Sequence, residues 1–385
     1  MGLKNHSLIK KINRAKILNS IRLKSPIARS QIAAVTDLDR KSITNFINEL
    51  LDEGIVEESG KQGNVSGRPF TMLKFIDKYA IGIYIAPHYT RGVLLDFYGN
   101  IHSSHEVEYP LYTDLVTINK AVENVYQVLS KKHCPDLGVG ICMPGIMDMV
   151  NYVMLDSVNI PSLNQVNFKE NFSSIIPGKL FFEEESRSIA LAEKWFGRGK
   201  DYNDFVVVEV SGGIGMGIVN DRHLFKGAGQ YAGEIGHIVI TPDGDLCRCG
   251  NHGCLEAYAS ERKVAKLLSE ASGLHFERLC YFNKDSVSDE EYRKIMRQTG
   301  EHLARGLGAV INIMCPKVIF LSGAVVKLFG KDLIACIQDA LQKNCPFGSL
   351  NQIELYVSSL EHIDAIGAAT LPLAEFFEVP GYFYV

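Results

Sequence analysis

The chain has 385 residues, of which 46% are hydrophobic, and a formal net charge of −4. This length allows two or three domains, each with its own core. No apolar run approaches the roughly 18 residues of a membrane span, and the basic N-terminal segment precedes no signal-peptide core. Nine cysteines in a chain of this length do not indicate a disulfide scaffold. We therefore expect a cytoplasmic protein without a membrane partner.

The charge is distributed unevenly along the chain. Residues 1–75 contain thirteen lysines and arginines against seven aspartates and glutamates, so this segment carries +6 and the remainder carries −10. A basic segment on an acidic body indicates that only the N-terminal part meets an anionic partner.

The N-terminal segment has the pattern of a helix-turn-helix. Apolar residues at helical spacing predict a first helix that ends at Ser25-Pro26, a second over residues 29–35, and a third capped by Asp39. In the third helix the apolar residues form one face, and the polar residues of the other face suit a major groove. The candidate DNA-contacting residues of this helix are Arg40, Lys41, Ser42, Thr44, Asn45 and Asn48.

Residues 55–75 alternate as two short strands around a glycine-rich tip, which is the pattern of a wing. In this tip, Arg68 is a candidate for entering a minor groove. The short turn, the basic third helix and the wing together predict a winged helix-turn-helix domain over residues 1–75, with operator DNA as its partner. The alternative is a protein-docking module with a solvated basic face.

From Ala80 onward, β-rich runs alternate with helical runs, as in an α/β protein. Residues 204–225 repeat the outline of residues 80–101: an apolar strand, a tight turn, a second apolar strand, a polar turn and a further strand. A repeat of this kind predicts two lobes of like topology with a cleft between them. The first copy lacks the chemistry of a phosphate loop, because Pro87 removes an N–H group and His88 and Tyr89 crowd the turn.

One imidazole and three thiols within 18 residues indicate a zinc site. His237, Cys247, Cys249 and Cys254 supply a tetrahedral ligand set, and the glycines between them allow the loop to fold round an ion. Four protein ligands close the coordination shell, so we expect a structural Zn²⁺. His252 is a rival ligand, and free thiols beside a core histidine are the alternative. The other cysteines are expected to be buried apolar residues: Cys134, Cys142, Cys280, Cys315, Cys336 and Cys345.

The motif G-E-I-G-H, followed by C-R-C-G-N-H-G-C-L-E, resembles the signature of the ROK family, which contains bacterial sugar kinases and sugar-responsive transcriptional repressors. The similarity extends over nearly all of residues 79–385, and a winged helix ahead of such a body is the layout of the family's repressors. The resemblance implies a two-lobed, actin-like (ribonuclease H-like) fold of the ATPase type. We expect a small lobe over residues 79–190, completed by a C-terminal helix over 363–385, and a large lobe with the zinc loop over 191–362.

The resemblance also implies where a sugar binds. Glu234 and Glu256 correspond to carboxylates that accept hydrogen bonds from sugar hydroxyls. His237 binds zinc and stands beside the sugar, and Asn159 resembles the family's asparagine before a proline, a further hydroxyl partner.

Two segments depart from the family's kinases. The first hairpin of the kinases resembles I-G-x-D-x-G-G-T, but this chain has Tyr84 in place of the aspartate and Pro87-His88 in the turn, so we expect no ATP binding. The catalytic aspartate aligns with Glu185, and the preceding sugar-binding asparagine aligns with Glu184. The longer Glu185 side chain displaces the carboxylate, and phosphoryl transfer depends on position. Glu184 adds a negative charge, which is expected to disfavour sugar phosphates and either to favour a cationic amino sugar or to leave no sugar binding at all.

These features together predict a sugar-responsive repressor of carbohydrate metabolism genes, with no catalytic residues, that acts as a homodimer or homotetramer. The main alternative is a ROK sugar kinase with an attached DNA-binding head. A third possibility is a DNA-binding regulator controlled by a protein partner or by no ligand.

Overall fold

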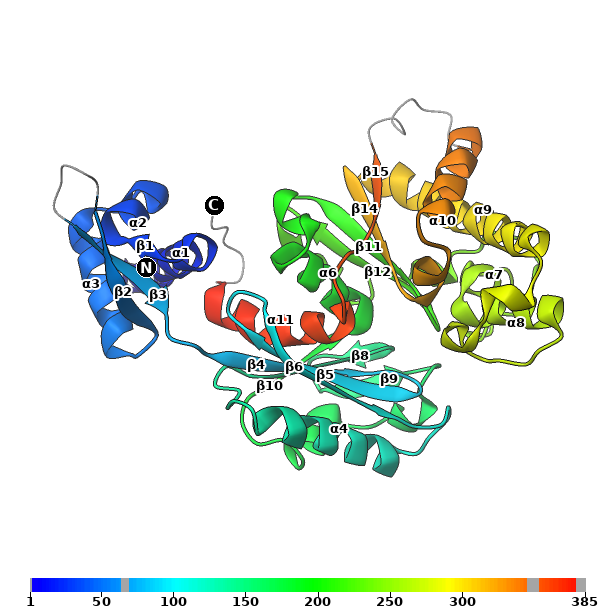
Figure 1. Cartoon of the computed structure of the whole chain (residues 1–385), viewed down its shortest axis with the longest axis horizontal. Helices are drawn as coiled ribbons and strands as arrows, with labels where there is room; N and C mark the ends of the chain where they lie inside the picture. The colour runs from blue at the N-terminus through cyan, green and yellow to red at the C-terminus, as the bar shows by residue number, and fades with distance from the viewer. Residues whose placement is uncertain (1, 64–68, 345–352, 379–385) are drawn as a thin grey trace.

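The computed structural model describes residues 2–63, 69–344 and 353–378. An N-terminal head stands to one side of a body that contains two five-stranded sheets (Figure 1). Within these described ranges, no helix is long and apolar enough to cross a membrane.

The head contains three helices, as the sequence predicts. They are α1 (Gly2–Lys24), α2 (Arg29–Thr36) and α3 (Arg40–Asp52). The side chain of Asp39 accepts a hydrogen bond from the backbone N–H of Ser42 at 2.9 Å, which is the expected N-cap of α3. The buried face of α3 is formed by Ile43, Phe46, Ile47 and Leu50.

A small antiparallel sheet completes the head. Its strands are β1 (Ile27–Ala28), β2 (Val56–Gln62) and β3 (Phe70–Phe75), in the order β1-β3-β2. The two wing strands β2 and β3 are confirmed, whereas β1 is too short to be recognised in the sequence. Arg68 lies outside the described residues.

The first sheet of the body has the strand order β10-β7-β4-β5-β6. Neighbouring β4, β5 and β6 are antiparallel, and β7 and β10 continue the sheet in parallel with β4. These strands are β4 (Tyr79–Ile85), β5 (Tyr89–Asp96), β6 (Ile101–Glu108), β7 (Gly138–Met143) and β10 (Leu180–Glu184). The segment before β10 contains β8 (Ile146–Asp148), β9 (Val153–Asp156), η1 (Pro161–Leu163) and α5 (Phe168–Ser173).

Helix α4 (Leu115–Ser130) packs on β4, β5 and β6, and α11 (Ile363–Phe377) packs on the sheet from the other side (Figure 1). Glycines in the strands permit the close approach of α11. A Cβ atom on Gly82 would lie 2.0 Å from the carbonyl oxygen of Ala365, and one on Gly140 would lie 1.8 Å from that of Ala368. The C-terminal helix therefore packs against the strand backbones.

The second sheet repeats the topology of the first. Its order is β13-β12-β11-β14-β15, with β11, β12 and β13 antiparallel and β14 and β15 parallel to β11. The strands are β11 (Phe205–Val210), β12 (Ile214–Asn220), β13 (His223–Leu224), β14 (Val318–Ser322) and β15 (Glu354–Val357). The longer helices of this half are α6 (Glu185–Trp195), α8 (Glu261–Ser272), α9 (Asp289–Met314) and α10 (Ala324–Asn344). The repeat predicted from residues 80–101 and 204–225 is thus present as two matching hairpins.

One of the expected boundaries falls within a helix. Helix α6 runs without interruption across residue 190, and it packs against β11 and β12 of the second sheet. The C-terminal helix extends to Phe377, and residues 379–385 lie outside the described residues.

Candidate functional site

The outward face of α3 carries the candidate DNA-contacting residues. Arg40, Lys41, Thr44, Asn45 and Asn48 are exposed there. Three residues already have local partners. The Thr44 hydroxyl donates to the carbonyl oxygen of Arg40 at 2.8 Å. Ser42 is partly buried, and its backbone N–H and hydroxyl both donate to Asp39. The Asn48 side chain lies 3.4 Å from a guanidinium nitrogen of Arg29. The free polar groups of this face are thus concentrated in the first two turns of the helix.

The four residues expected to bind zinc come together. One ligand atom from each of His237, Cys247, Cys249 and Cys254 can be chosen so that all lie within 4.8 Å of one another. The Sγ atoms of Cys249 and Cys254 are 3.8 Å apart. In a tetrahedral site with Zn–S bonds of about 2.3 Å, two thiolate sulfurs are separated by about 3.8 Å, so the geometry fits Zn²⁺.

Histidine 237 connects this metal group to the cleft. Its Nδ1 lies 3.8 Å from Cys247 Sγ, and its Nε2 lies 4.0 Å from a carboxylate oxygen of Glu234. A carboxylate beside the second ring nitrogen is a common way to orient a metal-binding imidazole. The rival ligand His252 points elsewhere, because its Nδ1 lies 2.9 Å from the carbonyl oxygen of Gly244.

The remaining cysteines do not all follow expectation. Cys142 is buried and Cys336 is half-buried, but Cys134, Cys280 and Cys315 are exposed, so their expected burial is wrong. These three lie in loops or at a helix end, where the apolar pattern around a residue does not determine its burial. Cys345 lies outside the described residues.

A cavity of about 1590 Å³ lies between the two halves of the body. Tyr84 and Asn159 line it from the half that contains the first sheet, and Glu209 and Glu256 line it from the other half. The Glu256 carboxylate accepts a hydrogen bond from the backbone N–H of Ile214 at 3.2 Å. The cavity combines aromatic, amide and carboxylate groups, a mixture that suits a small polar ligand.

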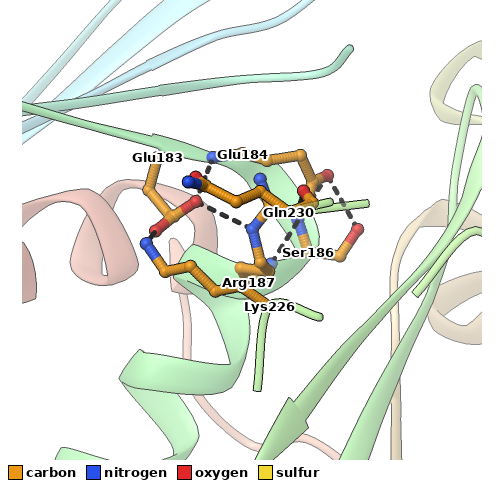
Figure 2. Close-up of polar contacts among 6 residues, drawn as sticks. All are labelled: Glu183, Glu184, Ser186, Arg187, Lys226 and Gln230. Carbon is orange, nitrogen blue, oxygen red and sulfur yellow. Dashed lines mark hydrogen bonds and ion pairs between the residues drawn. The ribbon is translucent and has the colours of Figure 1, made fainter. Parts of the chain in front are cut away.

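The glutamate run at the start of α6 forms an ordered network (Figure 2). The Glu184 carboxylate is the N-cap of α6 and accepts hydrogen bonds from the backbone N–H groups of Ser186 and Arg187 at 2.9 and 3.1 Å. Buried Glu183 pairs with the Arg187 guanidinium at 2.8 Å and also contacts Lys226. The helix terminus therefore offsets the negative charge of Glu184, which the sequence alone presents as an isolated charge.

Arg187 also joins this network to the segment that precedes G-E-I-G-H. Its guanidinium donates to the carbonyl oxygen of Gln230 at 3.1 Å, so residues 226–230 are tied to the start of α6 (Figure 2). Four residues later stands Glu234, whose side chain is 43% exposed; desolvation and the nearby Glu184 raise its pKa. The network thus sets the relative positions of two carboxylates at which a ligand is expected.

The two positions that depart from the kinases contact each other. The Tyr84 hydroxyl donates a hydrogen bond to the buried Glu185 carboxyl group, although the residues are 101 positions apart. Glu209, from β11, lies beside Glu185 and is also buried. Burial raises the pKa of Glu209 to about 7 and that of Glu185 well above its usual value. Two buried carboxyl groups side by side retain a proton more readily than one alone.

The six ligand-binding candidates occupy different environments. Asn159 and Glu256 line the cavity, whereas Glu185 is buried under Tyr84. Glu184 caps α6, and Glu234 and His237 lie at the junction between the cleft and the metal group. The geometry therefore brings all six residues to the same region, but they differ in how accessible they are to a ligand in the cavity.

Sequence reasoning missed three residues of this region: Arg187, Arg248 and Glu209. Arg187 reads as an ordinary member of a helix, and Arg248 occupies the variable position between two cysteines. Arg248 contacts the opposite half of the body, at Asn159. A charged residue within an otherwise apolar strand, such as Glu209 in F-V-V-V-E-V, is the one feature that pattern reading detects.

Two sheets of the same topology lie on either side of a cleft, and a winged helix-turn-helix precedes them in the chain. This arrangement defines a two-lobed, actin-like protein with a head of the DNA-binding type. A model of the ROK family matches residues 80–374, and the chain belongs to this family. The family resemblance and the fold class read from the sequence are confirmed.

Curated relatives match head and body together. The chain is 27% identical to the xylose repressor of Bacillus spizizenii over 389 aligned residues, which cover 98% of this chain and 99% of that protein. It is 26% identical to the DNA-binding transcriptional dual regulator NagC of Escherichia coli, over 95% of this chain and 93% of that protein.

Solved structures divide into two kinds. A ROK family transcriptional regulator, described as a homologue of the E. coli MLC protein, superposes with a TM-score of 0.76 at 23% identity and covers 96% of this chain. A ROK glucokinase from Streptomyces griseus, solved with glucose and AMPPNP, superposes with a TM-score of 0.66 at 22% identity and covers 76% of this chain and 98% of its own. The body has the fold found in both.

Proposed function

We propose that the protein is a transcriptional repressor of carbohydrate metabolism genes, whose affinity for operator DNA is controlled by a sugar in the cleft. The observation that carries the proposal is the head, in which α3 presents exposed polar side chains beside a wing. The repressors named above align with this chain over head and body, which supports a shared role. A cytoplasmic location follows from binding operator DNA.

The α3 face supports major-groove binding. Arg40, Lys41, Thr44 and Asn45 are exposed at the start of the helix, where side chains of a recognition helix contact base edges. Two such heads read two half-sites separated by about one helical turn, so we infer a homodimer or a homotetramer. Arg68 of the wing remains a candidate for the minor groove.

The cleft supports a small polyhydroxyl effector. Asn159 and Glu256 supply an amide and a carboxylate to the cavity from opposite halves of the body, and Glu234 and Glu184 lie nearby. Carboxylates in a partly dry cleft are strong acceptors for hydroxyl donors. Because the chain's relatives include a xylose repressor and the N-acetylglucosamine repressor of Escherichia coli O6:H1, D-xylose and N-acetylglucosamine are the first effectors to test.

The contact between Tyr84 and Glu185 supports the absence of kinase activity. A general base must be deprotonated and must reach the substrate hydroxyl. The Glu185 carboxyl group is buried, its pKa is raised by burial, and Tyr84 occupies one of its oxygens. We infer that this position contributes to packing between the lobes and not to phosphoryl transfer.

The metal group supports a structural Zn²⁺. His237 and three cysteines would hold the ion, which supplies a fixed tetrahedral anchor for the loop. The same loop carries Glu256 at its end and Glu234 ahead of it, so its rigidity determines where both carboxylates lie.

Two helices provide a path from the cleft to the head. Helix α6 begins at Glu185, beside the cleft, and ends at Trp195. Helix α11 begins beside Asp364, which lines the cavity, and ends at Phe377. Both ends meet α1: the Arg22 guanidinium lies over the Trp195 and Phe377 rings, and Asn19 donates to the carbonyl oxygen of Phe377 at 3.0 Å. Figure 1 shows α11 lying beside the head, with one end close to α1. A ligand that favours one arrangement of the lobes can thereby shift the head.

The test is a DNA titration with the chain's own promoter region, with and without D-xylose or N-acetylglucosamine. We expect specific binding that one sugar changes by about 5- to 150-fold, the usual range of allosteric coupling. Glu256→Gln should abolish the response and leave sugar-free DNA affinity nearly intact. Specific DNA binding that no sugar alters would favour control by a protein partner, and absence of specific DNA binding would refute the repressor.

A further inference from the structure

Arg248 spans the mouth of the cleft. It lies between two metal-binding cysteines on the metal loop (residues 237–254), which belongs to the half that contains the second sheet. Its Nη1 donates to Asn159 Oδ1 at 2.7 Å, and its Nη2 contacts the carbonyl oxygen of Val158. Both acceptors belong to the segment between β9 and η1, in the half with the first sheet.

This contact determines how the Asn159 amide is turned. A guanidinium has only donors, so the amide atom that faces it must be the oxygen. The NH₂ group is then left for the cleft. It lies on the side of Gly213, since a Cβ built on Gly213 would be 3.3 Å from Asn159 Nδ2 and 3.0 Å from Glu256 Oε2. A donor and an acceptor therefore stand side by side in the cavity.

Because Arg248 contacts two acceptors, the planar shape of its guanidinium matters for this contact. The planar fork of an arginine reaches two oxygens at once, whereas a lysine ammonium acts as a single compact charge. The neighbouring Arg262 also lines the cavity and lies close enough to lower the pKa of Arg248, after the larger effect of burial. Arg262 thus provides a matched arginine in the same electrostatic environment.

We propose that Arg248 is a positioning residue of the effector site, which turns the Asn159 amide so that its NH₂ faces the ligand and which holds the metal loop against the opposite lobe. The proposal rests on the proposed function, because it assumes that the effector binds in this cleft. The ligand group beside Asn159 is then an acceptor, and the group beside Glu256 is a donor. In a neutral sugar, a hydroxyl or carbonyl oxygen can accept the hydrogen bond from Asn159, and an adjacent hydroxyl group can donate one to Glu256.

The lobe contact is tested without any ligand. Hydrogen–deuterium exchange is measured on peptides that cover residues 157–164 and 245–254 of the zinc-loaded full chain. Arg248→Ala should speed exchange in both segments together by about 10-fold or more, because a hydrogen bond from a charged donor is lost. Arg248→Lys should recover only part of the protection, and Arg262→Ala should match the parent. Unchanged exchange in Arg248→Ala would overturn the proposal.

The orientation of the amide is tested by a second variant. Asn159→Asp keeps an acceptor for Arg248 but replaces the NH₂ donor with an oxygen. It should retain the protection of the parent in both segments and weaken binding of D-xylose or N-acetylglucosamine, whichever the parent binds, by about 10-fold. Undiminished sugar affinity in this variant would refute the donor role. If the parent binds neither sugar, the choice of effector fails, while the exchange experiment still decides the role of Arg248.

Discussion

The guanidinium of Arg22, on the first helix of the head, lies 4.3 Å from the centre of the Trp195 ring, at the far end of the helix that begins in the cleft. Burial lowers the pKa of Arg22 to about 10, so the group remains charged near neutral pH. A buried cation on an aromatic face contributes about 1–2 kcal/mol, which is enough to couple two rigid parts. Helix α6 therefore connects the head, through this pair, with the glutamate network at the start of the helix.

Replacing Arg22 should uncouple the two sites. We expect Arg22→Ala to reduce the effect of sugar on operator affinity at least about 5-fold, because the coupling energy passes through this contact. The measurement is the operator titration with and without effector. Arg14→Ala is the matched control, since Arg14 lies on the same helix but pairs with Glu53 inside the head. A full sugar response in Arg22→Ala would show that coupling takes another route.

Substitutions on α3 should weaken specific DNA binding. Lys41→Ala, Thr44→Ala and Asn45→Ala are each expected to cost about 1–3 kcal/mol if the side chain contacts a base edge. Binding to the operator and to unrelated DNA is compared at fixed salt concentration. Lys120→Ala, an exposed lysine on α4 of the body, controls for loss of charge. Equal operator affinity in all variants would place the DNA on another surface.

The metal group should hold about one zinc ion per chain. Cys249→Ser is expected to lower the zinc content, and to lower the Tm by about 5 °C or more, because metal binding contributes directly to folding free energy. Elemental analysis and thermal unfolding measure the two effects. His252→Ala should retain its zinc, since His252 bonds to a backbone carbonyl. Zinc retained in Cys249→Ser but lost in His252→Ala would point to a different ligand set.

The Glu185–Glu209 pair predicts a pH-dependent stability. Burial raises the pKa of Glu209 from 4.5 to about 7, so the folded protein binds more protons than the unfolded chain in this interval. The contribution of Glu209 to the free energy of unfolding should therefore be largest below about pH 4.5. It should fall by up to about 1.4 kcal/mol per pH unit as the pH rises toward 7.

Urea unfolding followed by the fluorescence of Trp195, the single tryptophan, measures this dependence. Glu209→Gln should flatten the profile, because an amide does not titrate. Glu106→Gln, at an exposed ion pair with Arg91, should leave the slope unchanged. The idea that the two buried carboxyl groups retain a proton would be contradicted if the free energy of unfolding of the parent rose between pH 5 and 7 and Glu209→Gln had the same slope.

No ATP-dependent phosphorylation of sugars is expected above background. Tyr84 and Pro87 replace the phosphate loop, and the carboxyl group at the position of the base is hydrogen-bonded to Tyr84. A coupled assay for ADP, with D-glucose, D-xylose and N-acetylglucosamine, tests this. Steady turnover that disappears in Glu185→Ala would establish a kinase with an attached DNA-binding head.

The features that depend on local pattern could be predicted from the amino-acid sequence. Helical spacing and the Asp39 cap predicted the three head helices, because burial of one face repeats every three to four residues. The close spacing of His237 and the three cysteines identified the metal group, since ligands near one another along the chain readily converge. The repeated hairpins predicted two sheets of like topology, because the strands of a hairpin are also close to one another along the chain.

Contacts between residues that are distant along the chain depend on tertiary packing and could not be predicted. Tyr84 meets Glu185 across 101 positions, and Arg248 meets Asn159 across 89. The sequence presents each of these side chains as an isolated charge or ring. Its partner depends on how whole helices and sheets pack, and no periodicity within one element contains that information. Packing also placed the end of α6 under Arg22.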